Sequence, residues 1–191
     1  MGIAADTIKL LFIARKEISD VWNGIRVCEF GNQRMRVNTV SYKTAKEYMS
    51  HIGAKHTSID LNGKDGALAL DLSKPISGIG EPFDMVTNFG TIEHVAEQYI
   101  PFCNMHNLTR VGGVMVHVMP LEGHWKGHGD YHYEERFVSG LTIANEYMMV
   151  HYTIIERKGQ MNLIGTVLKK MTDKPFISEA TFNTIQGLHK C

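Results

Sequence analysis

Two short stretches of this chain combine acidic, histidine and tyrosine side chains that could move protons. Glu93 and His94 follow an apolar run, and His128 and Tyr131 lie in the glycine-rich stretch 121–133. Because a histidine titrates near neutral pH, His128 or His94 could take a proton from a hydroxyl or an amine. These residues predict acid–base catalysis on a small molecule, with a hydrogen-bonded structural role as the alternative for His94.

The glycine-rich stretch also spaces three histidines as H-x3-H-x3-H, at His124, His128 and His132. On a helix this spacing would place the three rings on one face, where they could bind zinc. Three glycines in the same stretch disfavour a helix, so we expect no metal there. A zinc hydrolase stays a weaker alternative, and it would predict stoichiometric zinc in the purified protein.

The elements that must position these residues are read from apolar runs followed by polar loops. Strands are predicted at 27–31, 57–61 and 112–120, and residues 83–95 read as a buried strand that runs into a polar turn and then a helix. A further strand, the third in chain order, is predicted at 67–72. It should be short or displaced because the link before it is too short for a normal parallel crossover. Helices are predicted at about 3–19, 39–52, 91–109 and 134–144. Thr39 or Ser41 should cap the second of them, and Pro101 should break or kink the third near Ile100. A terminal antiparallel hairpin is predicted at 146–157 and 161–170. Polar strand ends at one sheet edge predict a ligand crevice there, and the 121–133 stretch should close over it as a substrate lid.

At these residues the chain resembles a known family. Residues 27–31, VCEFG, resemble the first motif of class I S-adenosylmethionine-dependent methyltransferases, and residues 83–95, FDMVTNFGTIEHV, resemble a segment of their small-molecule branch. The run from Gly112 to Pro120 is similar to that branch as well, so the likeness covers about residues 25–120. It implies a Rossmann-like α/β fold, an open and mostly parallel sheet with helices on both faces and a C-terminal antiparallel hairpin. The implied activity is methyl transfer from S-adenosylmethionine to an oxygen or nitrogen of a small molecule or sugar.

The cofactor's adenosine needs a hydrogen-bond acceptor for its ribose diol, and Asp60 at the end of the second strand is the candidate, with a solvated strand-end carboxylate as the alternative. By resemblance, Asp71 and Leu72 contact the adenine, although Asp71 could simply start a turn before Ser73. Gly31 should let the backbone approach the methionine part of the cofactor. The remaining cofactor-binding residues implied by the resemblance are Glu29, Asn32, Gln33, Leu61, Asn88, Phe89, Gly90 and Glu93.

Several of these residues keep a second interpretation. Glu29 could orient the loop, meet the cofactor's ammonium or act as a capping carboxylate, and Phe89 could be an ordinary core residue. Residues 31–33, Gly-Asn-Gln, replace the family's glycine-rich run, and the amides of Asn32 and Gln33 could instead meet the methionine carboxylate or the substrate. This departure leaves a second hypothesis open, a catalytically degenerate cofactor-binding or partner protein.

Composition limits the class of protein. The 191 residues suit one domain, and 20 basic against 20 acidic residues leave no excess charge for a nucleic-acid backbone. Three widely spaced cysteines without a C-x-x-C pair indicate a reduced, intracellular protein, and the apolar run 10–14 is too short for a membrane span. We therefore expect a cytoplasmic enzyme with a small-molecule acceptor, no nucleic-acid partner and no membrane association. The eleven methionines suit a core or an adaptable homodimer interface.

Overall fold

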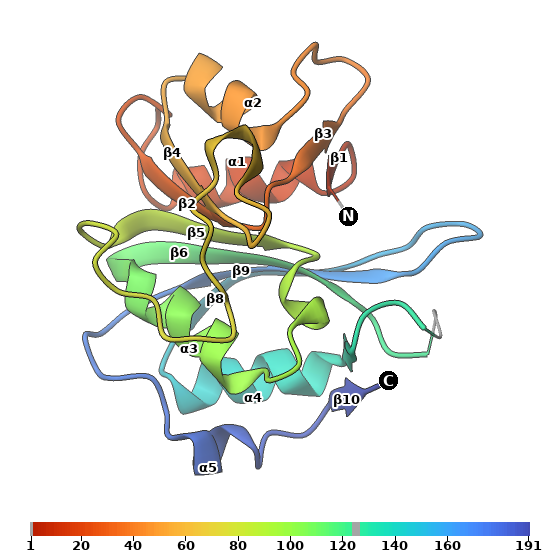
Figure 1. Cartoon of the computed structure of the whole chain (residues 1–191). Helices are drawn as coiled ribbons and strands as arrows, with labels where there is room; N and C mark the ends of the chain where they lie inside the picture. The colour runs from red at the N-terminus through yellow and green to blue at the C-terminus, as the bar shows by residue number, and fades with distance from the viewer. Residues whose placement is uncertain (1, 124–126) are drawn as a thin grey trace.

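A central sheet organises the protein in this computed structural model, which describes residues 2–123 and 127–191. Among these residues the main sheet has six strands in the order β4-β2-β5-β6-β9-β8 (Figure 1). The strands β4, β2, β5 and β6 are parallel, whereas β9 runs antiparallel to β6 and to β8. Their bounds are β2 Arg26–Phe30, β4 Lys55–Ile59, β5 Phe83–Phe89, β6 Thr109–Pro120, β8 Met148–Ile155 and β9 Leu163–Lys169. The predicted fold class, with its C-terminal hairpin, is confirmed.

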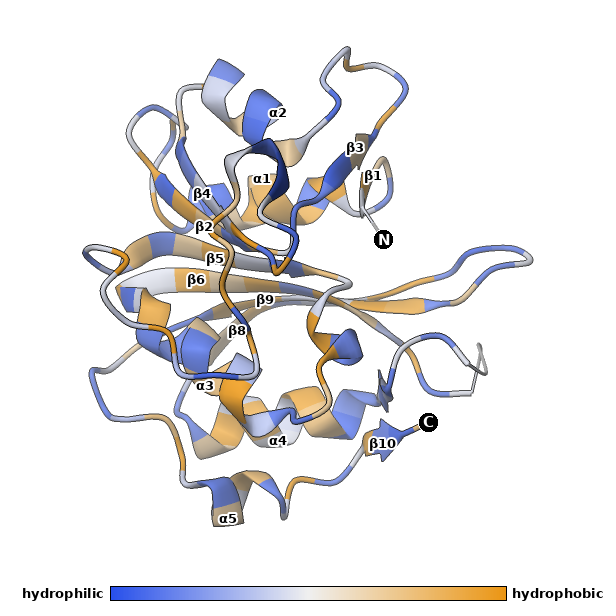
Figure 2. Ribbon diagram, in the orientation of Figure 1, coloured by the Kyte–Doolittle hydropathy of each residue, from blue (hydrophilic) through white to orange (hydrophobic). Residues whose placement is uncertain are grey.

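Helices cover both faces of this sheet. Figure 1 shows α1 (Ile8–Lys16) and α2 (Ala45–His51) on one face, and α3 (Tyr99–Leu108), α4 (Glu135–Ala144) and α5 (Glu179–Phe182) on the other. Each face has its own apolar cluster, one built on Leu10, Met49 and Phe89 and the other on Phe30, Phe102 and Phe137. Apolar residues run along β6 and recur on α4 (Figure 2). Buried strands between two helical layers are the expected arrangement for a parallel sheet.

Two small sheets complete the structure. The strand β1 (Gly2–Ala4) pairs in parallel with β3 (Arg34–Arg36), and β7 (Tyr131–Tyr133) pairs antiparallel with β10 (Leu188–Lys190). The predicted first helix was too long, because residues 2–4 form β1 and the helix covers only Ile8–Lys16. Short 3-10 helices, η1 (Lys64–Gly66) and η2 (Ile92–His94), lie in the loops after β4 and β5.

Two predicted helix boundaries were wrong for local reasons. The cap of α2 is Thr44 instead of Thr39 or Ser41: its side chain accepts from the Glu47 amide while the Glu47 carboxylate accepts from the Thr44 amide, a capping box. Pro101 does not break α3, because it lies in the first turn, where its missing N–H would have had no helical partner.

The predicted third strand is reduced to a single contact. Leu68 forms an isolated parallel bridge with Ile59, and the described residues between β4 and β5 contain no α-helix and no strand of the main sheet. The short link could not carry a crossover, as expected. Among the described residues, no helix is long and apolar enough to cross a membrane.

Candidate functional site

Polar side chains meet where β2 and β4 end. The backbone turns at Gly31, whose φ of +88° is favoured by glycine, and the Gly31 amide donates to the Ile59 carbonyl at 2.7 Å. The Asp60 carboxylate accepts from the backbone amides of Asn32 and Asn62 at 2.8 and 2.9 Å. These two bonds fix the carboxylate against the β2 loop. Asp60 is therefore oriented at the sheet edge and is not a freely solvated strand end.

A small pocket of about 140 Å³ opens beside Asp60. Four of the predicted cofactor-binding residues line it, namely Asp60, Leu61, Asp71 and Leu72, together with Thr91, His94 and two apolar side chains. Asp71 also starts a turn, since its carboxylate accepts from the amide and hydroxyl of Ser73, and this lowers the Asp71 pKa. The turn alternative and the pocket-lining position are therefore both observed for Asp71.

The space above Gly31 is occupied in this structure. A Cβ on Gly31 would lie 2.4 Å from the Thr91 Oγ1 and 2.6 Å from the Gln33 Nε2. Gln33 is buried and donates to the Thr91 hydroxyl at 2.7 Å, and that hydroxyl donates to the Phe30 carbonyl at 2.8 Å. The glycine thus allows a close approach, but here the approaching groups are these two side chains. Asn32 turns away and donates to the Asp65 carboxylate at 2.9 Å.

Glu29 lies beneath this loop in a buried position. Its carboxylate accepts from the Gln33 amide at 3.3 Å and lies 3.5 Å from the Nε2 of His56. Burial raises the Glu29 pKa, and the nearby His56 opposes that rise. The loop-orienting interpretation of Glu29 agrees with these contacts. Sequence reasoning missed His56, because nothing in the pattern of β4 distinguishes an inward-facing histidine from an exposed one.

The residues that end β5 shape the next turn. The side-chain oxygen of Asn88 accepts from the amides of Thr91 and Ile92 at 3.0 and 3.1 Å, and the Gly90 amide donates to the Val118 carbonyl at 2.9 Å. Phe89 is fully buried in the apolar cluster under α1 and α2, so its core interpretation is the one observed. Asn88 and Gly90 hold the turn that presents η2 at the sheet edge.

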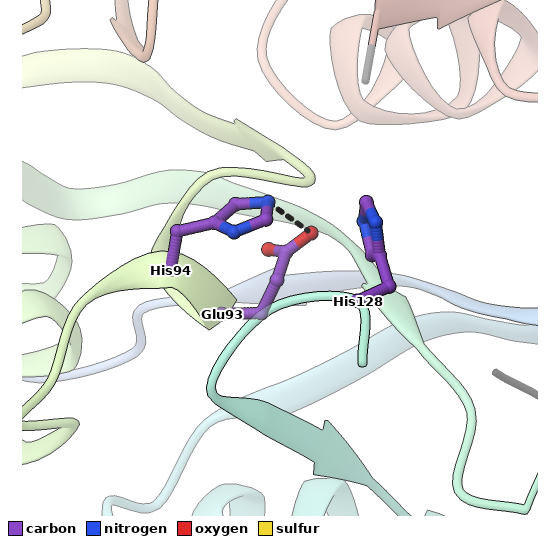
Figure 3. A group of neighbouring side chains, drawn as sticks. All are labelled: Glu93, His94 and His128. Atoms are coloured by element: carbon purple, nitrogen blue, oxygen red, sulfur yellow. Dashed lines mark ion pairs between the residues drawn. The ribbon is translucent and has the colours of Figure 1, made fainter. Parts of the chain in front are cut away.

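Glu93, His94 and His128 converge from two segments. Figure 3 shows the Glu93 and His94 side chains on η2 facing His128, which precedes β7. Donor atoms of the three residues all lie within 4.8 Å of one another, with the His94 Nε2 3.8 Å from the Glu93 Oε1. The rings of His94 and His128 meet edge to face, 5.1 Å between centroids. The chemistry of these donors suits proton transfer and would also suit a divalent metal ion.

Burial changes the charge state of this cluster. Glu93 is 0% exposed, and neither of its carboxylate oxygens has a hydrogen-bond partner among the residues that the structure describes. Burial raises its pKa to about 7. Burial also lowers the pKa of both His94 and His128 from 6.5, so both imidazoles favour the neutral form at neutral pH. A neutral imidazole can accept a proton, which is what a general base requires.

The segment before β7 is held close to η2 by its backbone. The Asp130 amide donates to the Glu93 carbonyl at 2.7 Å, and a Cβ on Gly129 would lie 3.1 Å from that same carbonyl oxygen. The Tyr131 hydroxyl donates to the Ala96 carbonyl at 2.8 Å and so ties the segment to the residues after η2. Gly129 therefore permits the approach that brings His128 to His94.

The H-x3-H-x3-H alternative does not hold for its two described members. His132 lies in β7, where its Nε2 contacts the His128 carbonyl oxygen at 3.1 Å and its Nδ1 lies 3.3 Å from the Glu122 carboxylate. The His132 ring therefore contacts other groups, whereas His128 faces His94. The two histidines do not share a helix face, because β7 is extended. His124 lies outside the described residues.

A larger cavity of about 610 Å³ lies on the other side of the histidine pair. Its walls come from the N-terminal segment with β1, from β3, from the turn between β8 and β9, and from His128. Because His94 lines the small pocket and His128 lines the large cavity, the two touching rings lie between them. Sequence reasoning placed His128 in the lid but gave no signal for the cavity, which depends on contacts between distant segments.

Comparison with solved structures finds the same α/β fold in class I S-adenosylmethionine-dependent methyltransferases, so the chain has their fold. The 1,6-didemethyltoxoflavin-N1-methyltransferase of Burkholderia thailandensis, solved with 1,6-didemethyltoxoflavin and S-adenosylhomocysteine, has a TM-score of 0.64 at 14% identity, covering 88% of this chain and 79% of that chain. The N-methyltransferase NodS of Bradyrhizobium japonicum WM9, solved with S-adenosylhomocysteine, has a TM-score of 0.59 at 14% identity, covering 85% and 84%. Comparisons with protein-family models and with curated proteins find no match.

Proposed function

We propose that this protein is an S-adenosylmethionine-dependent methyltransferase that acts on an oxygen or nitrogen of a small molecule. The observation that carries the proposal is the position of the His94–His128 pair between a small pocket and a large cavity. The small pocket would take the adenosine of the cofactor, with its ribose at Asp60 and its adenine against Leu72. The large cavity would take the acceptor.

The chain's own residues supply the proton chemistry. S-adenosylmethionine, when bound, would supply an electrophilic methyl group on sulfur for transfer to the acceptor atom. A neutral histidine would take the proton that the acceptor atom loses. His128 is the first candidate base because it lines the acceptor cavity, and His94 is the second. Tyr131 positions the segment that carries His128, through its bond to Ala96.

Cofactor entry would require one side chain to move. The small pocket, at about 140 Å³, is below the roughly 300 Å³ at which ligand pockets usually begin. The Gln33 amide closes the space over Gly31, where the methionine part of the cofactor would lie. Rotation of Gln33 would open that space and free its amide to meet the methionine carboxylate.

The test measures cofactor binding and turnover separately. Titration calorimetry with S-adenosylhomocysteine should show binding, and methyl-labelled S-adenosylmethionine should label a product in a metabolite extract. The His128→Gln variant should keep cofactor affinity and lower methyl transfer about a hundredfold, the usual contribution of a positioned base. His51→Gln, a change at an exposed histidine on α2, serves as the matched control and should leave both unchanged.

Three outcomes would contradict parts of this proposal. Full activity in His128→Gln would remove the histidine from catalysis. Binding without label transfer to any metabolite would favour the catalytically degenerate alternative, a protein that binds the cofactor without turnover. Stoichiometric zinc in the purified protein, together with activity lost to a chelator, would mean that Glu93, His94 and His128 hold a metal ion.

A further inference from the structure

The walls of the large cavity carry an excess of positive charge. Among the described residues, three cationic side chains line it, Arg36, Arg157 and Lys158, against one carboxylate, Asp6. The chain as a whole has equal numbers of basic and acidic residues, so this local excess does not follow from composition. Arg36 comes from β3, whereas Arg157 and Lys158 come from the turn between β8 and β9. Cations from distant segments are thus brought to one cavity.

The single carboxylate is already engaged. Asp6 accepts from the Nε and Nη2 of Arg157 at 2.6 and 2.8 Å, a bidentate pair that lowers the Asp6 pKa. The pair fixes the Arg157 guanidinium at the cavity wall and balances one positive charge with one negative charge. Among the described residues, the side chains of Arg36 and Lys158 have no ion-pair or hydrogen-bond partner. Two positive charges are therefore left unbalanced around the cavity.

We propose that the acceptor of this methyltransferase carries an anionic group, a phosphate or a carboxylate, which Arg36 and Lys158 bind beside the fixed Arg157. The inference rests on the proposed function, because it names the acceptor class of that same site. Guanidinium groups bind phosphate and carboxylate oxygens through paired N–H donors, and an ammonium adds a point charge. An uncharged acceptor could take only weaker hydrogen bonds from these donors and would leave both positive charges unbalanced.

The cavity also restricts how such a molecule lies. His128 lines the cavity together with the cations, so the nucleophilic hydroxyl or amine would lie at the histidine and the anionic group at the Arg36 and Lys158 wall. The cavity volume of about 610 Å³ falls within the range of roughly 300 to 1,000 Å³ that is typical of small-molecule sites. A polyol or sugar that bears one acidic group fits this description.

The experiment compares sugars that share a pyranose ring and differ in the group at carbon 6, which is a phosphate ester, a carboxylate or an uncharged hydroxymethyl group. Glucose 6-phosphate, glucuronate and glucose are titrated into the wild-type protein saturated with S-adenosylhomocysteine, at low and at high salt. We expect at least one of the two anionic sugars to bind at least ten times more tightly than glucose, with the preference reduced at high salt. The phosphate and carboxylate probes show which acidic group the site prefers.

Charge-reversal variants locate the site. The double variant Arg36→Glu with Lys158→Glu should lose the preference for the anionic probe by tenfold or more, while it keeps its affinity for S-adenosylhomocysteine. Lys55→Glu, at an exposed lysine at the amino end of β4, is the control and should change neither affinity. The intact S-adenosylhomocysteine affinity would show that the double variant is folded.

Two results would overturn the inference: equal affinity or no affinity for all three probes, or an anion preference that the double variant retains. Failure of the proposed function looks different. If the protein without cofactor binds anionic sugars through Arg36 and Lys158 but binds no S-adenosylhomocysteine, the anionic site stands and the methyltransferase proposal fails.

Discussion

Removal of the buried charge at Glu93 should stabilise the protein in a pH-dependent way. The carboxylate is fully buried, and in the described part of the chain neither oxygen has a hydrogen-bond partner. Burial raises its pKa from an ordinary value of 4.5 to about 7. Below pH 4.5 the group is protonated in both the folded and the unfolded state and contributes nothing to the pH dependence. Between 4.5 and about 7 the folded state binds the proton that the unfolded state releases, so the wild type loses stability as pH rises.

The size of the effect follows from that interval. The pKa difference between 4.5 unfolded and about 7 folded lowers the free energy of unfolding by about 3 kcal/mol above pH 7, at roughly 1.4 kcal/mol per pKa unit. Glu93→Gln removes the ionisation and keeps the shape. Relative to the wild type, the variant should therefore gain about 3 kcal/mol between acidic and mildly alkaline pH, on top of a constant offset from the new amide.

Urea unfolding of the cofactor-free protein at several pH values measures this difference directly. Glu97→Gln, which changes an exposed carboxylate a few residues away, is the control and should show no comparable pH dependence. A Glu93→Gln stability difference that stays constant with pH would refute the reasoning. It would mean that the Glu93 carboxylate is ionised with a partner in the folded protein.

Three further predictions concern the proposed cofactor site and its base. Asp60→Ala should weaken S-adenosylhomocysteine binding by about 1 to 3 kcal/mol, the cost of a buried ribose diol left without its acceptor, and unchanged affinity in calorimetry would remove Asp60 from the site. Gln33→Ala should increase the association rate of S-adenosylhomocysteine in stopped-flow measurements, because no amide then has to leave the space over Gly31, and an unchanged rate would contradict a displaced Gln33. Methyl transfer in single turnover should fall as pH drops below 6.5, because the depressed pKa of His94 and of His128 places their protonation on the acid side of that value, and a rate that rises toward acid pH would exclude a histidine base.

The sheet was predictable from sequence because its buried strands are continuous apolar runs that end in polar loops. The strand predicted at 27–31 is β2, which begins and ends one residue earlier, and the buried run predicted to open residues 83–95 is β5. The terminal hairpin followed from its two β-rich segments. Helix ends were less predictable, because several neighbouring Ser and Thr residues could cap α2. Thr44 is the one followed three residues later by a glutamate, Glu47, which completes the capping box. Whether Pro101 interrupts α3 depends on where the helix begins, because a proline in the first turn loses no helical hydrogen bond.

The clustering of candidate residues was predictable where it depends on strand ends and not where it depends on tertiary contacts, while their roles stay predictions. Asp60, Leu61, Asp71 and Leu72 line one pocket because each follows β4 or its short link closely. The partnership of Glu29 with His56, the closure of Gln33 over Gly31 and the cationic cavity wall all join segments far apart in the sequence. A single sequence gives no pairing information for such contacts, so they appear only in the folded chain.

The position of bound S-adenosylhomocysteine tests the central claim most directly. Diffraction from crystals soaked with this compound should show adenosine in the small pocket, with its ribose at Asp60 and its sulfur toward His94, and with Gln33 rotated away from Thr91. Density in the large cavity instead, or none at a concentration that saturates related methyltransferases, would contradict the account.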